Sequence, residues 1–285
     1  MNTPYQHIAI LGAGESGMGA AQFASKLGVH VFLSEYGILS NEDKLALTSW
    51  GVQYEEGGHS EAAILSAEAV IKSPGIPHSA PIIEKIKEAG KPLMGELDWA
   101  SRHTNAKIVA ITGSNGKTTT ATLCHHIISA QYDTVIAGNI GVSLGRVLAQ
   151  RMKDGQNDPE VIVLEVSSFQ LDDALIFEPH ISILTNITPD HLDRYNYDIS
   201  NYARSKFQLL DYTADTGHFI YCDDDQVSSE FLEKWQTKQN IKATLFAVGI
   251  DAPAGPHRVA HLNNNKIIIT LNNEAMTIEE LAMQG

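Results

Sequence analysis

The segment from Lys107 to Thr120, Lys-Ile-Val-Ala-Ile-Thr-Gly-Ser-Asn-Gly-Lys-Thr-Thr-Thr, constrains the fold of this 285-residue chain more than any other stretch. Ile108 to Ile111 has the length and β-branched content of a buried strand, and Thr118 to Ser129 has apolar residues at helical spacing. A glycine-framed loop with one lysine lies between them. A strand, a glycine loop and a helix N-terminus in this order predict an α/β fold with a site for an anion.

The loop from Gly113 to Thr118 has the residue types of a phosphate-binding loop. Backbone N–H groups and the helix dipole point at one spot, Lys117 adds a positive charge, and Thr118 adds a hydroxyl able to bind Mg²⁺. The general motif has a glycine five residues before the Gly-Lys pair, where this chain has Ile111. The alternative is a glycine-rich turn with an exposed lysine.

A second glycine motif lies near the N-terminus. The apolar strand Ile8 to Leu11 leads into Gly12-Ala13-Gly14-Glu15-Ser16-Gly17, and a helix from Ser16 to Leu27 and a strand from Val29 to Leu33 follow. Glu35 lies near the end of that second strand. A GxGxxG pattern in a βαβ context is typical of a dinucleotide site, and a different nucleotide or a structural turn are the alternatives.

Strands and helices continue to alternate up to Gly95, which predicts a parallel sheet covered by helices. Ser73-Pro74-Gly75-Ile76-Pro77 follows the apolar strand Ala69 to Lys72, at the sheet edge where α/β proteins bind ligands. An ordinary turn is the alternative for that loop. We place a domain boundary near Gly95, which gives an N-terminal domain of residues 1–95 and a central domain of residues 96–285.

Polar side chains follow the strands of the central domain. Glu165 interrupts the apolar strand Val161 to Val166, and a buried carboxylate is costly unless it is paired or bound to a cation. Glu165 is therefore a candidate Mg²⁺ ligand, with a solvent-facing edge residue as the alternative. His191 follows the strand Ile181 to Leu184. Further expected elements are helices at 201–210 and 229–236, strands at 219–222 and 244–248, and a β-hairpin at 258–271.

The charge balance excludes some classes of function. The chain has 20 Lys and Arg against 34 Asp and Glu, a formal net charge of −14, which argues against nucleic-acid binding through a basic surface.

No apolar run has the length of a membrane span and the N-terminus lacks a signal-peptide pattern, so we expect a cytoplasmic protein without membrane insertion. Cys124 and Cys222 are expected to be buried small hydrophobic residues.

Taken together, the motifs resemble the Mur ligases of bacterial peptidoglycan synthesis, from about Ile8 onward. The resemblance rests on five blocks, and Ser-Ser-Phe-Gln-Leu in the third points to the branch that adds D-glutamate: 113–119, 138–141, 164–171, 186–195 and 202–206. It implies a Rossmann-like UDP-binding domain followed by a P-loop-type ATPase domain with a mostly parallel sheet. It also implies a monomer that joins D-glutamate to UDP-N-acetylmuramoyl-L-alanine, using ATP and an acyl-phosphate intermediate.

The resemblance also implies roles for residues. Lys117, Asn139, Glu165, His191 and Lys206 would be catalytic. Thr118 and Glu165 would hold one Mg²⁺, and His191 would hold a second together with Lys206, which is carbamylated in this family. The ATP phosphates would contact Gly113, Ser114, Asn115, Gly116, Lys117, Thr118 and Thr119. The UDP-muramoyl substrate would contact Glu15, Ser16, Gly17, Ser34, Glu35, Ser73, Pro74, Gly75, Ile76, Asn139 and His191.

The chain departs from the family pattern in two places. It has Ser34-Glu35-Tyr36 where relatives carry an Asp-Thr-Arg-like group, so an arginine for the uridine is missing. It also ends before the C-terminal domain that binds the incoming amino acid, so we expect substrate binding without turnover. Two other functions are compatible with the motifs: an NAD-dependent oxidoreductase with a Rossmann domain, and a non-catalytic module that sequesters UDP-muramoyl peptides.

Overall fold

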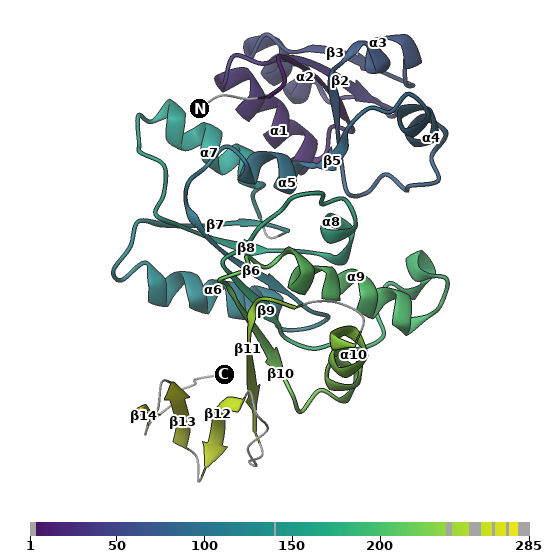
Figure 1. Ribbon diagram of the computed structural model, residues 1–285. Helices are drawn as coiled ribbons and strands as arrows, with labels where there is room; N and C mark the ends of the chain where they lie inside the picture. The colour runs from purple at the N-terminus through teal and green to yellow at the C-terminus, as the bar shows by residue number, and fades with distance from the viewer. Residues whose placement is uncertain are drawn as a thin grey trace. The chain divides into compact units, whose positions relative to one another are not determined.

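The computed structural model describes residues 4–139, 141–237, 241–250, 258–263, 266–271 and 274–278. The chain forms two compact units: Met1–Lys107 with Thr122–Phe177, and Ile108–Ala121 with Glu178–Gly285. Strands and helices alternate along both units (Figure 1). The predicted α/β class is confirmed.

The first unit contains a five-stranded parallel sheet in the order β3-β2-β1-β4-β5. Its central strand is the most apolar, since Ile8, Ala9, Ile10 and Leu11 are all fully buried. The chain leaves β1 toward β2 on one side and returns to β4 on the other, which opens a crevice at the carboxyl ends of β1 and β4. The strands are β1 (His7–Leu11), β2 (His30–Glu35), β3 (Gln53–Glu56), β4 (Ala69–Lys72) and β5 (Leu93–Gly95).

Helices cover this sheet as the alternation predicted. In α4 (Pro81–Glu88) the proline starts the helix and the three isoleucines at helical spacing are buried. α1 (Glu15–Lys26) packs against α5 (Glu96–Ser101) and α7 (Leu144–Lys153) (Figure 1). The remaining helices of the sheet are α2 (Asn41–Ser49) and α3 (Glu61–Ser66).

Sequence patterning did not predict α5 or α7. Five of the six residues of α5 are buried, including Glu96 and Asp98, so its sequence shows no alternation of apolar and polar faces. The same unit contains the parallel pair β7 (Thr134–Gly138) and β8 (Val161–Glu165). The short helix α8 (Ser168–Asp172) begins with a capping box, in which Ser167 and Gln170 exchange side-chain and backbone hydrogen bonds.

The strands of the second unit follow one another in the order β14-β13-β12-β11-β10-β9-β6. The pairs from β6 to β12 are parallel, and β13 and β14 add as antiparallel strands, so the predicted hairpin is confirmed. The strands are β6 (Lys107–Thr112), β9 (Ile181–Leu184), β10 (His218–Cys222), β11 (Thr244–Gly249), β12 (Arg258–Asn263), β13 (Lys266–Leu271) and β14 (Glu274–Ile278). The helices are α9 (Ile199–Tyr212), α10 (Gln226–Gln236) and the 3₁₀ turn η1 (Leu192–Tyr195).

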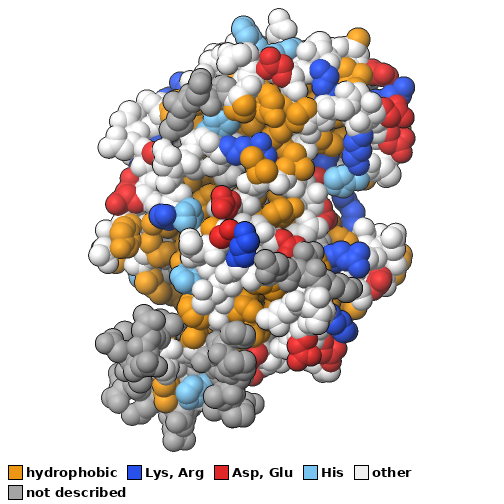
Figure 2. All heavy atoms as spheres, viewed as in Figure 1, with side chains coloured by type: hydrophobic (Ala, Val, Ile, Leu, Met, Phe, Trp, Pro, Cys, Tyr) orange, Lys and Arg blue, Asp and Glu red, His pale blue; other side chains and the backbone are white. Residues whose placement is uncertain are grey.

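The helix α6 (Lys117–Ile128) begins in the second unit and ends in the first. Its apolar residues share one side as predicted, but Leu123 is 56% exposed and Ile127 is 62% exposed, while Ala121 is buried. Basic and acidic side chains are mixed on the face shown in Figure 2, without a broad basic patch. Among the residues that the structure describes, no helix has the length and apolar content needed to cross a membrane.

Candidate functional site

The loop between β6 and α6 has a backbone that requires glycine. Gly113 has φ of +144°, and a Cβ there would lie 1.9 Å from Thr185 Oγ1. Gly116 has φ of +79° and stands immediately before the first residue of the helix, Lys117. The glycines therefore let the chain turn sharply from strand to helix, so that the N–H groups at the start of α6 face the loop.

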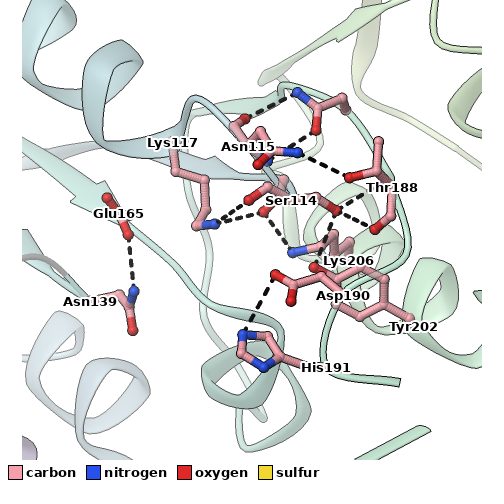
Figure 3. A network of polar contacts seen from close by, with 12 residues as sticks. Ser114, Asn115, Lys117, Asn139, Glu165, Thr188, Asp190, His191, Tyr202 and Lys206 are labelled. Carbon is pink, nitrogen blue, oxygen red and sulfur yellow. Dashed lines mark hydrogen bonds and ion pairs between the residues drawn. The ribbon is translucent and has the colours of Figure 1, made fainter. Parts of the chain in front are cut away.

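Two lysines meet the carbonyl groups of this loop (Figure 3). Lys117 Nζ donates to the Gly113 carbonyl at 2.9 Å and to the Ser114 carbonyl at 3.0 Å. Lys206 Nζ, which comes from α9 and is 1% exposed, donates to the same Gly113 carbonyl at 2.8 Å. The loop thus holds two amines within reach of one backbone oxygen, a strongly positive setting for an anion.

Polar side chains after β9 hold the loop in place. Ser114 Oγ donates to the Thr188 carbonyl at 2.8 Å and accepts from Thr188 N–H at 2.9 Å. Asn115 N–H donates to Asn186 Oδ1 at 3.0 Å, and Asn115 Nδ2 donates to Thr188 Oγ1 at 3.0 Å. The polar residues that follow β9 therefore fix the loop that follows β6, and these two strands are neighbours in the sheet.

The residues around Lys206 form a compact network. Lys206 Nζ lies 4.5 Å from the centre of the Tyr202 ring, and the Tyr202 hydroxyl lies within hydrogen-bond distance of Ser114 Oγ, at 3.2 Å. Burial raises the pKa of Tyr202, so its hydroxyl stays protonated. His191 has φ of +49° and its Nε2 lies 3.6 Å from Asp190 Oδ2. Such a backbone costs about 1–3 kcal/mol in a residue other than glycine and clusters at functional sites.

Glu165 and Asn139 belong to the first unit and form a hydrogen-bonded pair (Figure 3). Glu165 is 3% exposed, which rules out the solvent-facing alternative. Asn139 Nδ2 donates to Glu165 Oε1 at 2.9 Å, and Asn139 N–H donates to the Glu165 carbonyl at 2.8 Å. The two residues stand at the carboxyl ends of β7 and β8, so the sheet register brings them together.

The side chains of the site limit which metal ion it could hold. The described residues contain no group of three or more His, Cys, Asp or Glu that could hold a metal by itself. Thr118 in the second unit and Glu165 in the first unit each offer an oxygen of the kind that Mg²⁺ binds, and this ion is commonly bound by one or two protein oxygens together with substrate phosphates and water. Each group by itself therefore fits a metal that arrives with a phosphate ligand.

The N-terminal glycine loop is built on close packing and a paired carboxylate. A Cβ at Gly17 would lie 1.9 Å from the Gly12 carbonyl oxygen, so this glycine lets α1 approach β1. Glu15 accepts from the Arg146 guanidinium at 2.7 and 2.9 Å and from Ser143 N–H at 3.0 Å. Burial acts to raise the pKa of Glu15, but hydrogen bonds from Arg146 and Ser143 outweigh it and lower that pKa.

A buried ion pair supports the loop after β4. Lys72 is 1% exposed, and its Nζ lies 2.7 Å from Asp173 Oδ2 and donates to the Ile76 carbonyl at 2.8 Å. Asp173 directly follows α8, and its other oxygen lies 3.0 Å from His78 Nε2. The pair thus joins the loop to the end of α8. The loop after β4 and Gln170 of α8 line a cavity of about 440 Å³, whose full lining is Gly14, Glu15, Ser16, Ser73, Pro74, Gly75, Gly138, Asn139, Gly141 and Gln170.

A larger cavity of about 750 Å³ lies at the carboxyl edge of the five-stranded sheet. Glu35, Tyr36 and Ile76 line it, together with Gly12 and His59. Glu35 accepts from Ala13 N–H at 2.7 Å and from Gly37 N–H at 2.7 Å. Ser34 is fully buried beside these residues, so its hydroxyl takes part in the wall rather than in the open space.

The sequence motifs led to many, but not all, of these groups. In the first unit, the predicted substrate residues Glu15, Ser16, Gly75 and Asn139 line one cavity. In the second unit, Lys117 and Lys206 converge on Gly113. Sequence reasoning missed three groups: the ion pair Lys72–Asp173, the buried Glu96 and His59. A lysine at the end of an apolar strand was the signal for the first of these.

The chain is similar to known proteins in both sequence and fold. The family model of the Mur ligase middle domain matches residues 111–282, and that of the MurD N-terminal domain matches residues 7–81. UDP-N-acetylmuramoylalanine–D-glutamate ligase from Christiangramia forsetii is 41% identical over 281 residues, which are 98% of this chain and 60% of that protein. The protein of the same name from Porphyromonas gingivalis is 42% identical over 285 residues, with 98% and 60% covered. The chain thus spans about 60% of the length of these relatives.

Solved structures support the fold. UDP-N-acetylmuramate:L-alanyl-gamma-D-glutamyl-meso-diaminopimelate ligase from Neisseria meningitides matches with a TM-score of 0.61 and 17% identity, covering 98% of this chain and 89% of that one. UDP-N-acetylmuramate–alanine ligase from Thermotoga maritima matches with a TM-score of 0.52 and 18% identity, covering 97% and 61%. At these identities the likeness concerns the fold alone.

Proposed function

Because the chain belongs to the Mur ligase family, we propose that it is the substrate-binding and ATP-binding part of an ATP-dependent ligase that adds D-glutamate to UDP-N-acetylmuramoyl-L-alanine. The substrates are proposed from the printed name of the relatives that are 41% and 42% identical. The match to the MurD N-terminal domain favours this function over an NAD-dependent oxidoreductase.

The observation that carries the proposal is the loop from Gly113 to Thr119. Its backbone can only be made by glycine at position 113, it begins a helix, and two lysine amines reach its carbonyl groups. These are the features that bind the phosphate groups of a nucleoside triphosphate. In this proposal Lys117 stabilises the charge that develops on the transferred phosphoryl group, and the N–H groups of the loop align it.

Metal ions would neutralise phosphate charge, with Thr118 and Glu165 as proposed ligands for one Mg²⁺ and His191 and Lys206 for a second. Lys206 can serve as a metal ligand in this role only after carbamylation, in which its neutral amine adds to CO₂ and releases one proton to give an anionic carbamate oxygen. Mass spectrometry of the intact protein under bicarbonate tests the modification, and Lys206→Arg should abolish it.

The first unit would bind the UDP-muramoyl substrate. Residues 1–95 form the proposed UDP-binding domain, and Asn139 the proposed contact to the muramoyl group. Two cavities of about 440 and 750 Å³ lie at the crevice between β1 and β4, in the size range of small-molecule sites. Glu15, Ser16 and Gly17 and the loop from Ser73 to Ile76 would meet the phosphates and sugars, and the residues after β2 would meet the uridine.

A direct test measures phosphate release by the full-length gene product with ATP, Mg²⁺ and UDP-N-acetylmuramoyl-L-alanine. We expect release that depends on D-glutamate and that Lys117→Met reduces by at least two orders of magnitude, about the loss seen when one transition-state donor is removed. Release that is equal with L-glutamate or without an amino acid would refute the assignment to the D-glutamate branch. Binding of the muramoyl substrate with no phosphate release would instead support a sequestering module.

A further inference from the structure

The base-binding end of the proposed substrate site contains a relay of hydrogen bonds that the sequence motifs did not predict. It rests on the proposed function, because it concerns the nucleobase of the UDP substrate. The relay runs from Glu55 on β3 through Ser34 on β2 to His59, which follows β3. His59, Tyr36 and Glu35 all line the cavity of about 750 Å³ at the carboxyl edge of the sheet.

The distances define the relay. Ser34 Oγ lies 2.7 Å from Glu55 Oε1 and 2.6 Å from His59 Nδ1. Ser60 N–H donates to the same Glu55 oxygen at 2.7 Å. Ser34 is fully buried, so its hydroxyl cannot exchange these partners for water. A serine hydroxyl has one proton to donate, and the Gly58 carbonyl, at 3.4 Å, is a more distant acceptor than the carboxylate or the imidazole.

The charge on Glu55 decides where that proton goes. Burial acts to raise the pKa of Glu55, but hydrogen bonds from Ser60 and Ser34 outweigh it and lower that pKa, so the carboxylate is ionised. An ionised carboxylate only accepts hydrogen bonds, so the Ser34 hydroxyl donates to Glu55. The oxygen of Ser34 must then accept from His59, which places a proton on Nδ1.

The second nitrogen of His59 is left as an acceptor. Burial lowers the pKa of His59, against the opposing charges of Glu55 and Glu35, which keeps the ring neutral near pH 7. A neutral ring with a proton on Nδ1 carries a lone pair on Nε2. Within the described residues no hydrogen bond reaches Nε2, and that atom is absent from the fully buried polar atoms without a partner. It is therefore open to a ligand in the cavity.

An aromatic face stands beside this acceptor. The ring of Tyr36 is 75% exposed, and its centre lies 5.7 Å from that of His59 with the planes tilted by 48°. A flat base that stacks on Tyr36 would turn an edge toward His59, because the two rings are inclined to each other. The pair therefore offers a face and a hydrogen-bond acceptor to one planar ligand.

We infer that His59, held by Ser34 and Glu55, reads the base of the substrate by accepting a hydrogen bond from a ring N–H, and that Tyr36 stacks on the same base. Uracil carries such a donor at N3. Cytosine carries a lone pair at N3, which would face the lone pair of Nε2. The site is thus built for a uridine nucleotide and against a cytidine nucleotide, and Ser34 and Glu55 act as positioning residues.

The test is calorimetric titration of the 285-residue chain with UDP, with CDP and, as a control for folding, with ATP and Mg²⁺. We expect UDP to bind at least about ten-fold more tightly than CDP, the effect of one satisfied against one opposed hydrogen bond. His59→Phe keeps a ring beside Tyr36 but loses the acceptor. It should bring the affinities for UDP and CDP within about three-fold of each other and leave ATP binding unchanged.

Two matched variants sharpen the result. Ser34→Ala removes the group that fixes the proton of His59 on Nδ1, so it should lower the UDP preference by less than His59→Phe does. Tyr36→Phe keeps the aromatic face and should leave the ratio of UDP to CDP affinity unchanged. If His59→Phe does not fold, the nitrogen chemical shifts of His59 in the unaltered protein decide, since we expect the proton on Nδ1. A proton on Nε2, or an unchanged UDP preference in a folded His59→Phe protein, overturns the inference.

If the unaltered protein binds UDP and CDP equally, only this inference fails. If it binds neither UDP nor the muramoyl substrate, the proposed function fails with it.

Discussion

The two glycine loops share a backbone design and differ in the charge at the first residue of the helix that follows. In both, a strand ends, glycines make the turn, and a helix starts. α1 starts with Glu15, which is paired with Arg146 and suits the positive end of a helix dipole. α6 starts with Lys117, which the dipole disfavours and whose amine contacts backbone carbonyls.

The difference separates charges that serve the fold from charges that serve a ligand. Two charged groups near the N-terminal loop are paired with groups of opposite charge: Glu15 with Arg146, and Lys72 with Asp173. A lysine at a helix N-terminus gains nothing from the dipole, so its presence is best explained by an anion that binds there. The comparison predicts that substitutions in the first group change stability, and that substitution of Lys117 changes ligand binding.

The largest effect is expected for the buried ion pair. Lys72→Met leaves the Asp173 carboxylate buried without its ammonium partner, which should lower the free energy of unfolding by about 3–5 kcal/mol. Denaturant unfolding measures this. The double variant Lys72→Met/Asp173→Asn removes both charges and should recover most of the loss. If the single variant is as stable as the unaltered protein, the pair does not support the loop.

A second effect on stability depends on pH. Burial raises the pKa of Glu96 from 4.5 to about 7, and its Oε2 has no hydrogen-bond partner among the described residues. Below pH 4.5 the carboxyl group is protonated in both states, and above it the unfolded state ionises first. Stability therefore falls between about pH 4.5 and pH 7, by about 3 kcal/mol in total.

Glu96→Gln removes this titration. The variant should be more stable than the unaltered protein at pH 8. The difference in unfolding free energy between the two proteins should be larger at pH 8 than at pH 4 by up to about 3 kcal/mol. Thermal unfolding of both proteins across this range gives the difference. If the stability difference between the two proteins does not change with pH, the pKa of Glu96 is not raised in the folded protein.

The third prediction concerns Lys117, where stability should not change. Lys117→Met removes a charge that contacts phosphate in the proposed complex, so ATP affinity should fall roughly 10- to 100-fold. UDP affinity and the unfolding midpoint should stay within error. Lys153→Met, at an exposed position at the end of α7, is the control of equal charge and should alter none of these quantities. Loss of UDP binding in Lys117→Met would break the distinction between the two loops.

The smallest effect is expected for Glu15. The Glu15 side chain in this pair is 44% exposed, so Glu15→Gln should cost less than about 1 kcal/mol of stability. UDP affinity should change by less than about three-fold if the loop meets the phosphates through its N–H groups. A large loss of UDP affinity would show that the carboxylate itself binds the substrate.

Sequence reasoning was most successful where a local rule decides the structure. The strand before Gly113 and the helix start at Lys117 follow from short-range patterns, and Asp225 caps α10 from its position immediately before the helix. It failed for α5, because buried carboxylates hide the apolar face. Lys72–Asp173 and Ser34–His59 connect residues that are 101 and 25 positions apart, so only the tertiary fold brings them together.

The central claim is that one chain carries two separate nucleotide sites, and a competition titration tests it most directly. UDP-N-acetylmuramoyl-L-alanine is titrated into the protein alone and into the protein saturated with ATP and Mg²⁺. We predict one muramoyl site in both titrations, and ATP binding that survives saturation with the muramoyl substrate. Displacement of ATP by the muramoyl substrate in proportion to its occupancy would mean a single shared site, and would contradict the claim.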